Sequence, residues 1–145
     1  MTRSHVSFTR LDSELPGPSR AHPGDAGFDL VTREDVRLEP GERAMAPTGV
    51  ALAIPEGLAG LVLPRSGLAA RHGVGVVNSP GLIDSGYRGE VKVLLVNHGA
   101  ERVEFARGER IAQLLITPVP VIEMIEVDEL DDTVRGSGGF GSTGR

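Results

Sequence analysis

The densest group of reactive side chains in this sequence lies within residues 81–93, which read GLIDSGYRGEVKV. Asp84, Tyr87 and Arg88 fall within five consecutive positions there, so a carboxylate, a phenol and a guanidinium are close together. The apolar residues before them and the alternating pattern after them predict a β-hairpin with a glycine-bearing turn. Such a tip can project side chains into a neighbouring pocket. The alternative is an ordinary polar turn, because Asp, Ser and Gly are common in turns.

A second group suited to chemistry lies in residues 64–73, PRSGLAARHG. A short helix is predicted at residues 68–71, and its first backbone N–H groups would lie beside Arg65 and Ser66. Helix starts of this kind bind anions, so Ser66 is interpreted as a phosphate ligand. Its alternative role as a hydrolase nucleophile is disfavoured, because the surrounding residues read PRSGL and not G-x-S-x-G.

Two further polar residues lie in predicted strands. Asp29, in the stretch DAGFDLV, alternates with apolar residues and is expected on the opposite face of its strand. It is either a solvated carboxylate or part of a site. Gln113, within the apolar segment 107–116, needs a partner if it is buried. It is therefore either a satisfied structural group or a ligand contact.

The end of the chain, residues 135–145, reads RGSGGFGSTGR and has too little apolar surface to fold by itself. Its spaced glycines imitate a P-loop, but the lysine and the following helix are missing, so that interpretation fails. Two options remain. The segment is either a disordered end or a mobile arm whose backbone N–H groups wrap an anion while Phe140 covers a flat ring.

The other segments must form the scaffold for these groups, and short alternating apolar runs predict strands. The predicted strands are residues 6–10, 25–31, 36–40, 42–47, 50–54, 58–63, 74–78, 91–96, 103–106, 107–116 and 119–127. A pair of strands is expected around Gly41, and a hairpin is expected around residues 55–57. The mostly apolar run 91–96 is expected to be buried on both faces.

Composition narrows the class of protein. The 145 residues correspond to one domain, and 20 glycines with 10 prolines suit short strands joined by tight turns. The absence of cysteine excludes a disulfide framework, and the four histidines show no metal-binding spacing. A net charge of −5 argues against a general nucleic-acid binder. No segment approaches the roughly 20 apolar residues of a membrane span and the start lacks a signal peptide, so a soluble cytoplasmic protein without membrane contact is expected.

Five stretches, taken together and in order, carry a specific resemblance. They are DAGFDL, PRSGLAARHG, NSPGLIDSGYRGEVKV, GERIAQLLI and RGSGGFGSTG. They closely resemble the five motifs of the trimeric dUTPases, the deoxyuridine triphosphate nucleotidohydrolases. The resemblance implies an all-β, jelly-roll-like β-barrel of the β-clip type over residues 1–134, with one short helix, and a flexible glycine-rich arm over residues 135–145.

The resemblance also implies an activity, a cofactor and a partner. It implies hydrolysis of dUTP to dUMP and pyrophosphate with Mg²⁺, in a homotrimer whose active sites lie between subunits. Such an enzyme controls the ratio of dUTP to dTTP and supplies dUMP for thymidylate synthesis. Asp84 would be the general base for the attacking water, and Tyr87 would lie against the deoxyribose and exclude a 2′-hydroxyl. The uracil edge would be recognised by Asn78, Gly81, Leu82 and Ile83.

The remaining implied roles concern the phosphates and the arm. Arg135 would bind the γ-phosphate, the backbone around Gly138 and Gly139 would close over the phosphate chain, and Phe140 would stack on the uracil. Asp29 would contact the waters of Mg²⁺. The phosphates would be held by Arg65, Ser66, Gly67 and Gln113.

Three other functions compete with this one. A dCTP deaminase of related fold is disfavoured, because the segment with Asp84 and Tyr87 and the glycine tail resemble the hydrolase. A catalytically silent nucleotide sensor would be indicated by the loss of a catalytic residue, and no motif position is lost. A purely structural β-domain would not explain the motif arginines, such as Arg65 and Arg135, or the glycine-rich tail.

Overall fold

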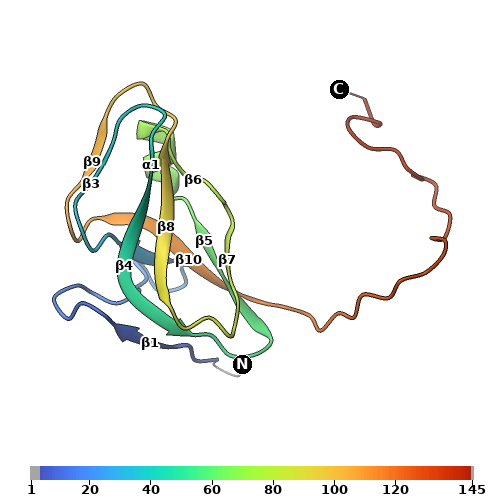
Figure 1. The fold of residues 1–145 in the computed structure, drawn as a ribbon, viewed down its shortest axis with the longest axis horizontal. Coiled ribbons are helices and arrows are strands. Elements are labelled where there is room, and N and C mark those ends of the chain that lie inside the picture. Colours follow the sequence, from blue (N-terminus) through green and yellow to red (C-terminus); the bar gives the residue numbers. More distant parts are fainter. Residues whose placement is uncertain (1–3, 145) are drawn as a thin grey trace.

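The computed structural model describes residues 4–144, and its folded body is built almost entirely from β-strands (Figure 1). One antiparallel sheet has the order β1, β4, β8, β6, formed by Ser7–Arg10, Arg43–Ala53, Glu90–Asn97 and Val74–Val76. A second has the order β2, β10, β5, β7, formed by Phe28–Val31, Arg110–Pro118, Leu58–Leu63 and Gly81–Ile83. A third pairs β3, Val36–Leu38, with β9, Val103–Phe105. The predicted all-β, jelly-roll-like fold is confirmed.

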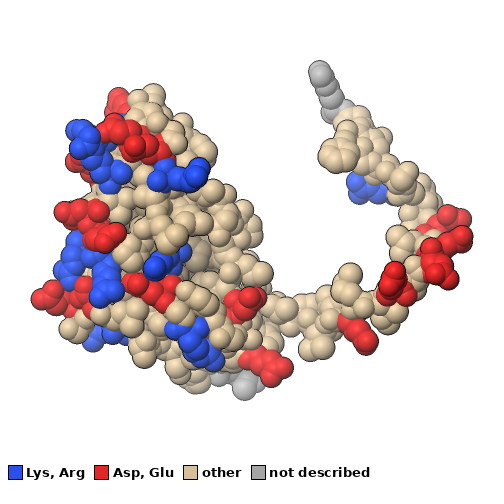
Figure 2. Space-filling view, in the orientation of Figure 1, with Lys and Arg blue, Asp and Glu red and all other residues tan. Residues whose placement is uncertain are grey.

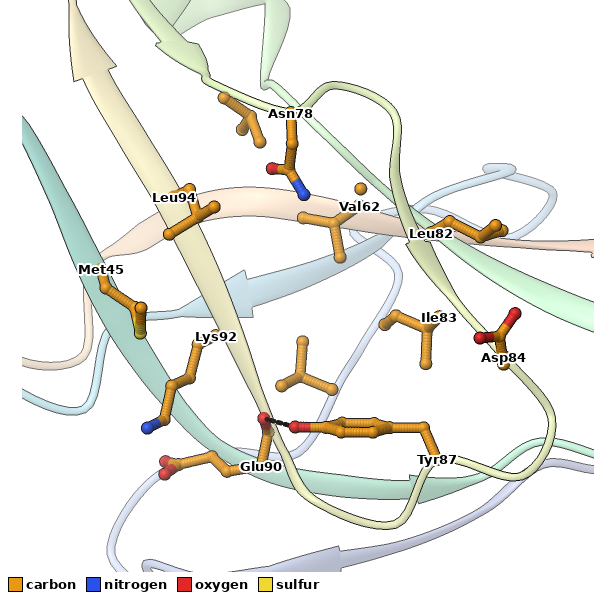
Figure 3. Close-up of a pocket in the computed structure, with 13 residues that line it drawn as sticks. Met45, Val62, Asn78, Leu82, Ile83, Asp84, Tyr87, Glu90, Lys92 and Leu94 are labelled. Carbon is orange, nitrogen blue, oxygen red and sulfur yellow. Dashed lines mark hydrogen bonds between the residues drawn. The ribbon is translucent and has the colours of Figure 1, made fainter.

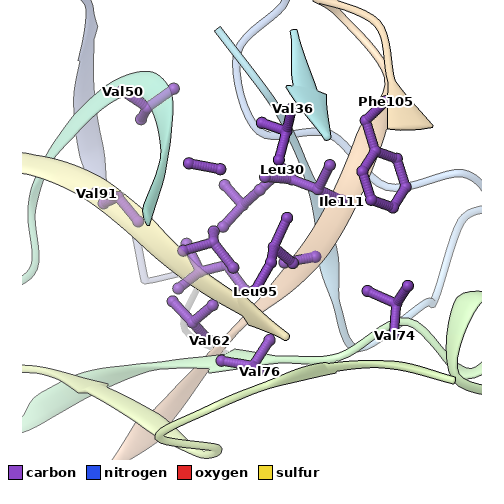
Figure 4. Packing of buried hydrophobic residues seen from close by; sticks show 14 of the residues in the cluster. Leu30, Val36, Val50, Val62, Val74, Val76, Val91, Leu95, Phe105 and Ile111 are labelled. Atoms are coloured by element: carbon purple, nitrogen blue, oxygen red, sulfur yellow. The ribbon is translucent and has the colours of Figure 1, made fainter. Parts of the chain in front are cut away.

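The core lies between the two larger sheets, where apolar side chains from both pack together (Figure 4). Leu95 on β8 and Ile111 on β10 are almost completely buried, as are Leu30 on β2 and Leu38 on β3. Burying each such side chain stabilises the fold by about 1.5–3 kcal/mol. This packing explains why the alternating runs of the sequence form strands, since each strand turns its apolar face toward the opposite sheet.

The prediction that residues 91–96 are buried on both faces is wrong for the single chain. In β8, Val91, Val93 and Leu95 are buried, whereas Lys92 is exposed and Leu94 is half-buried. The strand belongs to a sheet that packs on the core with one face only, so its other face remains open within the described chain.

The predicted hairpin of residues 81–93 is also wrong. β7 pairs with β5 in one sheet, whereas β8 pairs with β4 and β6 in the other, so the segment between them crosses from sheet to sheet (Figure 1). Ile83 at the end of β7 and Val91 at the start of β8 both face the same core. The crossing buries both residues in the core between the two sheets, and this packing decides against pairing β7 with β8.

Two other predicted pairings fail for the same reason. β4 runs unbroken from Arg43 to Ala53 where two strands were expected, and β5 then joins the opposite sheet. The turn at Gly41 does not pair its flanking strands, because β3 pairs with β9. In each case local turn residues correctly mark a change of direction, but the partner strand is chosen by packing across the core.

The single helix among the described residues, α1, spans Ser66–His72 and includes the predicted helix at residues 68–71. It ends at Gly73, whose φ of 67° lies in the left-handed region that favours glycine at helix ends. Leu68 packs against the core and fixes the helix to the barrel. The helix therefore places Ser66 and Gly67 directly after β5. No helix in residues 4–144 is long and apolar enough to cross a membrane.

The last predicted strand, residues 119–127, is absent. The chain leaves the barrel after β10 and extends away from it without regular structure (Figure 1). The space-filling view shows the same segment standing apart from the folded body (Figure 2). Its apolar side chains are exposed, including Val121, Ile122 and Ile125. The alternating pattern is suited to a strand, but no described strand of the same chain pairs with it.

Candidate functional site

A hollow of about 330 Å³ lies beside the crossing from β7 to β8 (Figure 3). Asn78 lies at one end of it, and Asp84 and Tyr87 lie at the other. Gly81 is buried close to the Asn78 side chain, and an added Cβ would approach the amide nitrogen of Asn78 to 3.3 Å. Leu82 and Ile83 complete the wall formed by β7. The structure thus brings together the residues of segment 78–87 that were predicted to contact the uracil edge, the sugar and the attacking water.

The loop that carries Asp84 is closed by hydrogen bonds of its own. The Tyr87 N–H donates to the Asp84 carbonyl at 3.1 Å, and the Arg88 guanidinium donates to the Ser85 carbonyl at 2.6 Å. The Asp84 side chain is exposed, and among residues 4–144 no side chain pairs with its carboxylate. A carboxylate held on a closed loop and free of protein partners is available to a water molecule.

A second hollow, of about 350 Å³, lies where β2, β10 and the start of α1 meet. The carboxylate of Asp29, only 17% exposed, pairs with Arg65 at 3.3 Å and with Arg110 at 3.2 Å. Asp25 also lines this hollow, so its two guanidinium groups and two carboxylates balance in charge. Ser66 and Gly67 line it as well, so it contains every residue predicted at the start of the helix. The two guanidinium groups are suited to pairing with an anion.

Gln113 belongs to the same hollow, where it lies between Asp29 on β2 and Leu63 on β5 in the register of β10. Its side-chain amide donates to the Pro64 carbonyl at 2.8 Å, and its carbonyl oxygen lies against Gly27. This glutamine is therefore a satisfied structural group that also lines the hollow, and its contact with a ligand stays a prediction. Arg110 was not among the predicted site residues, although its position just after the glycine-bearing segment 107–109 was a usable signal.

The predicted residues of the tail lie apart from both hollows (Figure 1). Phe140 is fully exposed, and the Arg135 guanidinium donates only to the nearby Gly138 carbonyl at 3.0 Å. Gly139 has open space around it. In addition, the two hollows share no lining residue. One chain therefore presents the predicted site in three separate parts.

Comparisons with known proteins agree with the motifs. The dUTPase family model matches residues 13–144. A deoxyuridine 5'-triphosphate nucleotidohydrolase of Thermobifida fusca is 61% identical over 140 residues, which cover 96% of this chain and 78% of the relative. One of Nocardia farcinica is 56% identical over 142 residues, covering 97% and 86%.

Solved structures show the same likeness. The dUTPase of Staphylococcus bacteriophage 80alpha with dUPNHPP has a TM-score of 0.89 and 31% identity, covering 99% of this chain and 100% of that chain. A dUTPase of the S. aureus phage phi11, in work on the coordination of a structural Mg(II) ion, has a TM-score of 0.79 and 29% identity, covering 87% and 98%. This chain belongs to the dUTPase family.

Proposed function

We propose that this protein hydrolyses dUTP to dUMP and pyrophosphate. The observation that carries the proposal is the exposed, unpaired carboxylate of Asp84 at the rim of a hollow whose other walls include Tyr87 and Asn78. Asp84 would accept a proton from a water molecule whose oxygen attacks the α-phosphorus. The new P–O bond forms as the bond to the bridging oxygen breaks, and pyrophosphate leaves.

The nucleoside would lie along β7, which is an edge strand of its sheet within the described chain. The free edge of a strand presents backbone N–H and C=O groups, and these can pair with the uracil edge as another strand would. Ile83 and Gly81 are buried on the inner side, which fixes that edge in place. The amide of Asn78 would add a donor and an acceptor at the end of the hollow.

The phosphates would occupy the second hollow, where Arg65, Ser66, Gly67 and Gln113 converge. The ion pair between Asp29 and Arg65 holds the guanidinium in place before the ligand arrives. No group of three His, Asp or Glu side chains in residues 4–144 is arranged to hold a metal ion. A Mg²⁺ ion ligated mainly by phosphate oxygens and water needs few protein ligands, and Asp29 is the carboxylate that would contact its waters. When bound, the ion would neutralise charge on the phosphates.

The two hollows can serve one substrate if each site is built between copies of the chain, which supports the proposed homotrimer. The extended segment after β10 supports association as well. Its apolar residues Val121, Ile122, Met124 and Ile125 are between 70% and 102% exposed, and a second copy could cover them.

We expect the protein to sediment as a trimer, at about three times the 15.3 kDa mass of one chain. Sedimentation at micromolar concentration measures this directly. Replacing Ile122 with Asp should weaken the assembly, because it puts a charge on the apolar segment, whereas Glu123→Asp should leave it intact. A fully active monomer would rule out sites shared between subunits.

Tyr87→Ala should narrow the preference for dUTP over UTP by about tenfold, because excluding an added hydroxyl depends on a wall that leaves it no room. The measurement is kcat/KM for both nucleotides. Leu11→Ala serves as the control, because Leu11 is exposed and does not line the hollow. An unchanged ratio in Tyr87→Ala would place the sugar filter elsewhere.

The experiment that tests the proposed function is release of pyrophosphate from dUTP, dCTP, dTTP and UTP in parallel, with Mg²⁺ present. Pyrophosphate should be released from dUTP much faster than from the other nucleotides. Release of ammonia from dCTP instead would identify the related deaminase activity. No turnover of any nucleotide would favour a silent nucleotide sensor.

A further inference from the structure

The ring of Tyr87 contacts two residues at the start of β8, namely Gly89, which precedes the strand, and Glu90, which begins it. Its hydroxyl donates a hydrogen bond to the backbone carbonyl of Glu90 at 2.9 Å (Figure 3). The ring lies directly over Gly89, where an added Cβ would overlap the ring carbons and the hydroxyl. Tyr87 itself is 46% exposed, so its ring is only partly covered by the protein. Gly89 and Glu90 therefore contribute directly to the position of the ring.

Glu90 is in turn fastened through its side chain, which is only 16% exposed. Its carboxylate accepts a hydrogen bond from the backbone N–H of Gly49 at 2.9 Å and lies 3.5 Å from the Arg33 guanidinium. Charge-assisted hydrogen bonds of this kind are stronger than neutral ones. They hold the Glu90 backbone, and with it the acceptor for the Tyr87 hydroxyl.

A β-bulge in β4, the neighbouring strand, places the Gly49 N–H beside Glu90. The register between β4 and β8 shifts between Pro47 and Ala51, and Gly49 has a φ of 72°. This bulge turns the Gly49 N–H toward the Glu90 carboxylate in place of a ladder partner. The adjacent Thr48, which is completely buried, donates to the Val91 carbonyl at 2.6 Å. Hydrogen bonds from β4 therefore fix the first two residues of β8, Glu90 and Val91.

Arg33 extends the attachment to the N-terminal loop. It donates to the Leu11 carbonyl at 3.2 Å and pairs with Asp12 at 3.6 Å. A hydrogen bond from Arg107 lowers the pKa of Asp12, so this carboxylate, which is ionised at neutral pH in any case, also stays charged beside Arg33 in more acidic solution. The end of the loop that carries Asp84 is therefore joined to parts of the chain that line neither hollow.

We propose that Gly89 and Glu90 are positioning residues that set the sugar specificity of this protein by holding the Tyr87 ring against the nucleoside hollow. Gly89 leaves the space that the ring occupies, and Glu90 supplies the acceptor for its hydroxyl. This inference rests on the proposed function, in which Tyr87 is the wall that excludes a 2′-hydroxyl.

The first test compares two glycines of the same loop. Gly89→Ala puts a methyl group where the ring lies, whereas Gly86→Ala meets no atom within 4 Å, and neither glycine has a positive φ. Gly89→Ala should lower the ratio of kcat/KM for dUTP over UTP roughly fivefold or more, since small misplacements in a site have large effects. Gly86→Ala should leave that ratio unchanged. Equal ratios in the two variants would overturn the role of Gly89.

The second test separates the hydrogen bond of Glu90 from its charge. Glu90→Gln keeps an acceptor for the Gly49 N–H, so the ratio should stay within about twofold of the wild type. Glu90→Ala removes the acceptor, and the ratio should fall as it does in Gly89→Ala. Glu104→Ala, at an exposed position of β9, is the matched control. An unchanged ratio in a folded Glu90→Ala variant would overturn the role of Glu90.

A third readout does not depend on activity. Tyr87 is the single tyrosine and the chain has no tryptophan, so intrinsic fluorescence reports this ring alone. The anisotropy decay should gain a fast component in Gly89→Ala and Glu90→Ala, and should match the wild type in Gly86→Ala and Glu90→Gln. An unchanged decay in both Gly89→Ala and Glu90→Ala would overturn the proposal that these residues hold the Tyr87 ring. A wild-type protein inactive on dUTP would overturn the proposed function instead, and the fluorescence result would still decide whether Gly89 and Glu90 hold the ring.

Discussion

Asp84→Asn should lower dUTP turnover by at least about 10²-fold while leaving dUTP binding within about tenfold, because the amide has the same shape but cannot accept a proton. The structure favours this separation of binding from chemistry. The carboxylate is exposed on its loop and has no partner among the described side chains, so its replacement disrupts no ion pair in the protein. The loop itself is closed by Tyr87 and Arg88 through backbone carbonyls, which the substitution does not alter.

Single-turnover rates and calorimetric binding of a non-hydrolysable dUTP analogue measure the two effects separately. Glu56→Gln, the same change of charge at the exposed turn between β4 and β5, is the control and should behave as the wild type. An Asp84→Asn variant that keeps a third of the wild-type turnover would exclude Asp84 as the general base. A large loss of binding with little loss of turnover would give the carboxylate a role in holding the substrate.

Removal of residues 134–145 is the second change with a large expected effect, and it should reduce dUTP turnover by about 10²-fold or more without lowering the melting temperature. Stability should be unchanged because the segment packs on nothing in the described chain. Val134 and Phe140 are fully exposed, and the hydrogen bonds of Arg135 and Gly136 reach no further than Gly138 and the adjacent Thr133. Its loss therefore exposes no buried surface.

Turnover should fall because binding gives this segment the partners that it lacks in the free chain. Arg135 would pair with the terminal phosphate, and the backbone around Gly138 and Gly139 would close over the phosphate chain. These charge-assisted hydrogen bonds would offset the entropy lost when the arm becomes ordered. Closure would exclude bulk water and leave the one water held by Asp84.

A Phe140→Trp variant places the only tryptophan of the chain on the arm. Its fluorescence should change when a non-hydrolysable dUTP analogue is added with Mg²⁺, and should change much less with dUMP, which lacks the phosphates that Arg135 needs. Combining Phe140→Trp with Arg135→Gln should reduce the response to the analogue. Equal responses to the two ligands, or near-normal turnover of the truncated protein, would identify the segment as a disordered end.

The short segments that carry the candidate site residues could be identified from sequence because their turn and strand signals are local, whereas the roles of those residues rest on the resemblance of the five motifs. Asp84 and Tyr87 lie in one loop, and Arg65, Ser66 and Gly67 lie in one strand-to-helix junction. Turn residues and alternating apolar residues act over a few positions, and so most strands and the helix were predicted close to their observed bounds. These features depend on backbone sterics and on the two-residue period of a strand.

Strand pairing could not be predicted in the same way, because it is decided by contacts between residues far apart in the chain. β7 and β8 follow one another yet lie in different sheets, since Ile83 and Val91 are both buried in the core between them. The run 119–127 has the pattern of a strand but pairs with no strand in residues 4–144, so the pattern alone gave the wrong result.

The amino-acid sequence by itself determined which side chains are available for chemistry and on which short segments they lie. Only the tertiary structure decided their grouping, with Asn78, Asp84 and Tyr87 around one hollow and Asp29 and Gln113 around another. It also decided that the Tyr87 hydroxyl bonds to Glu90, whose carboxylate is held in turn by Gly49 in a bulge some forty positions earlier. A prediction from local signals could not include this connection. The reason is physical: local propensity acts through the backbone of neighbouring residues, whereas the core brings distant strands together by burying their apolar faces.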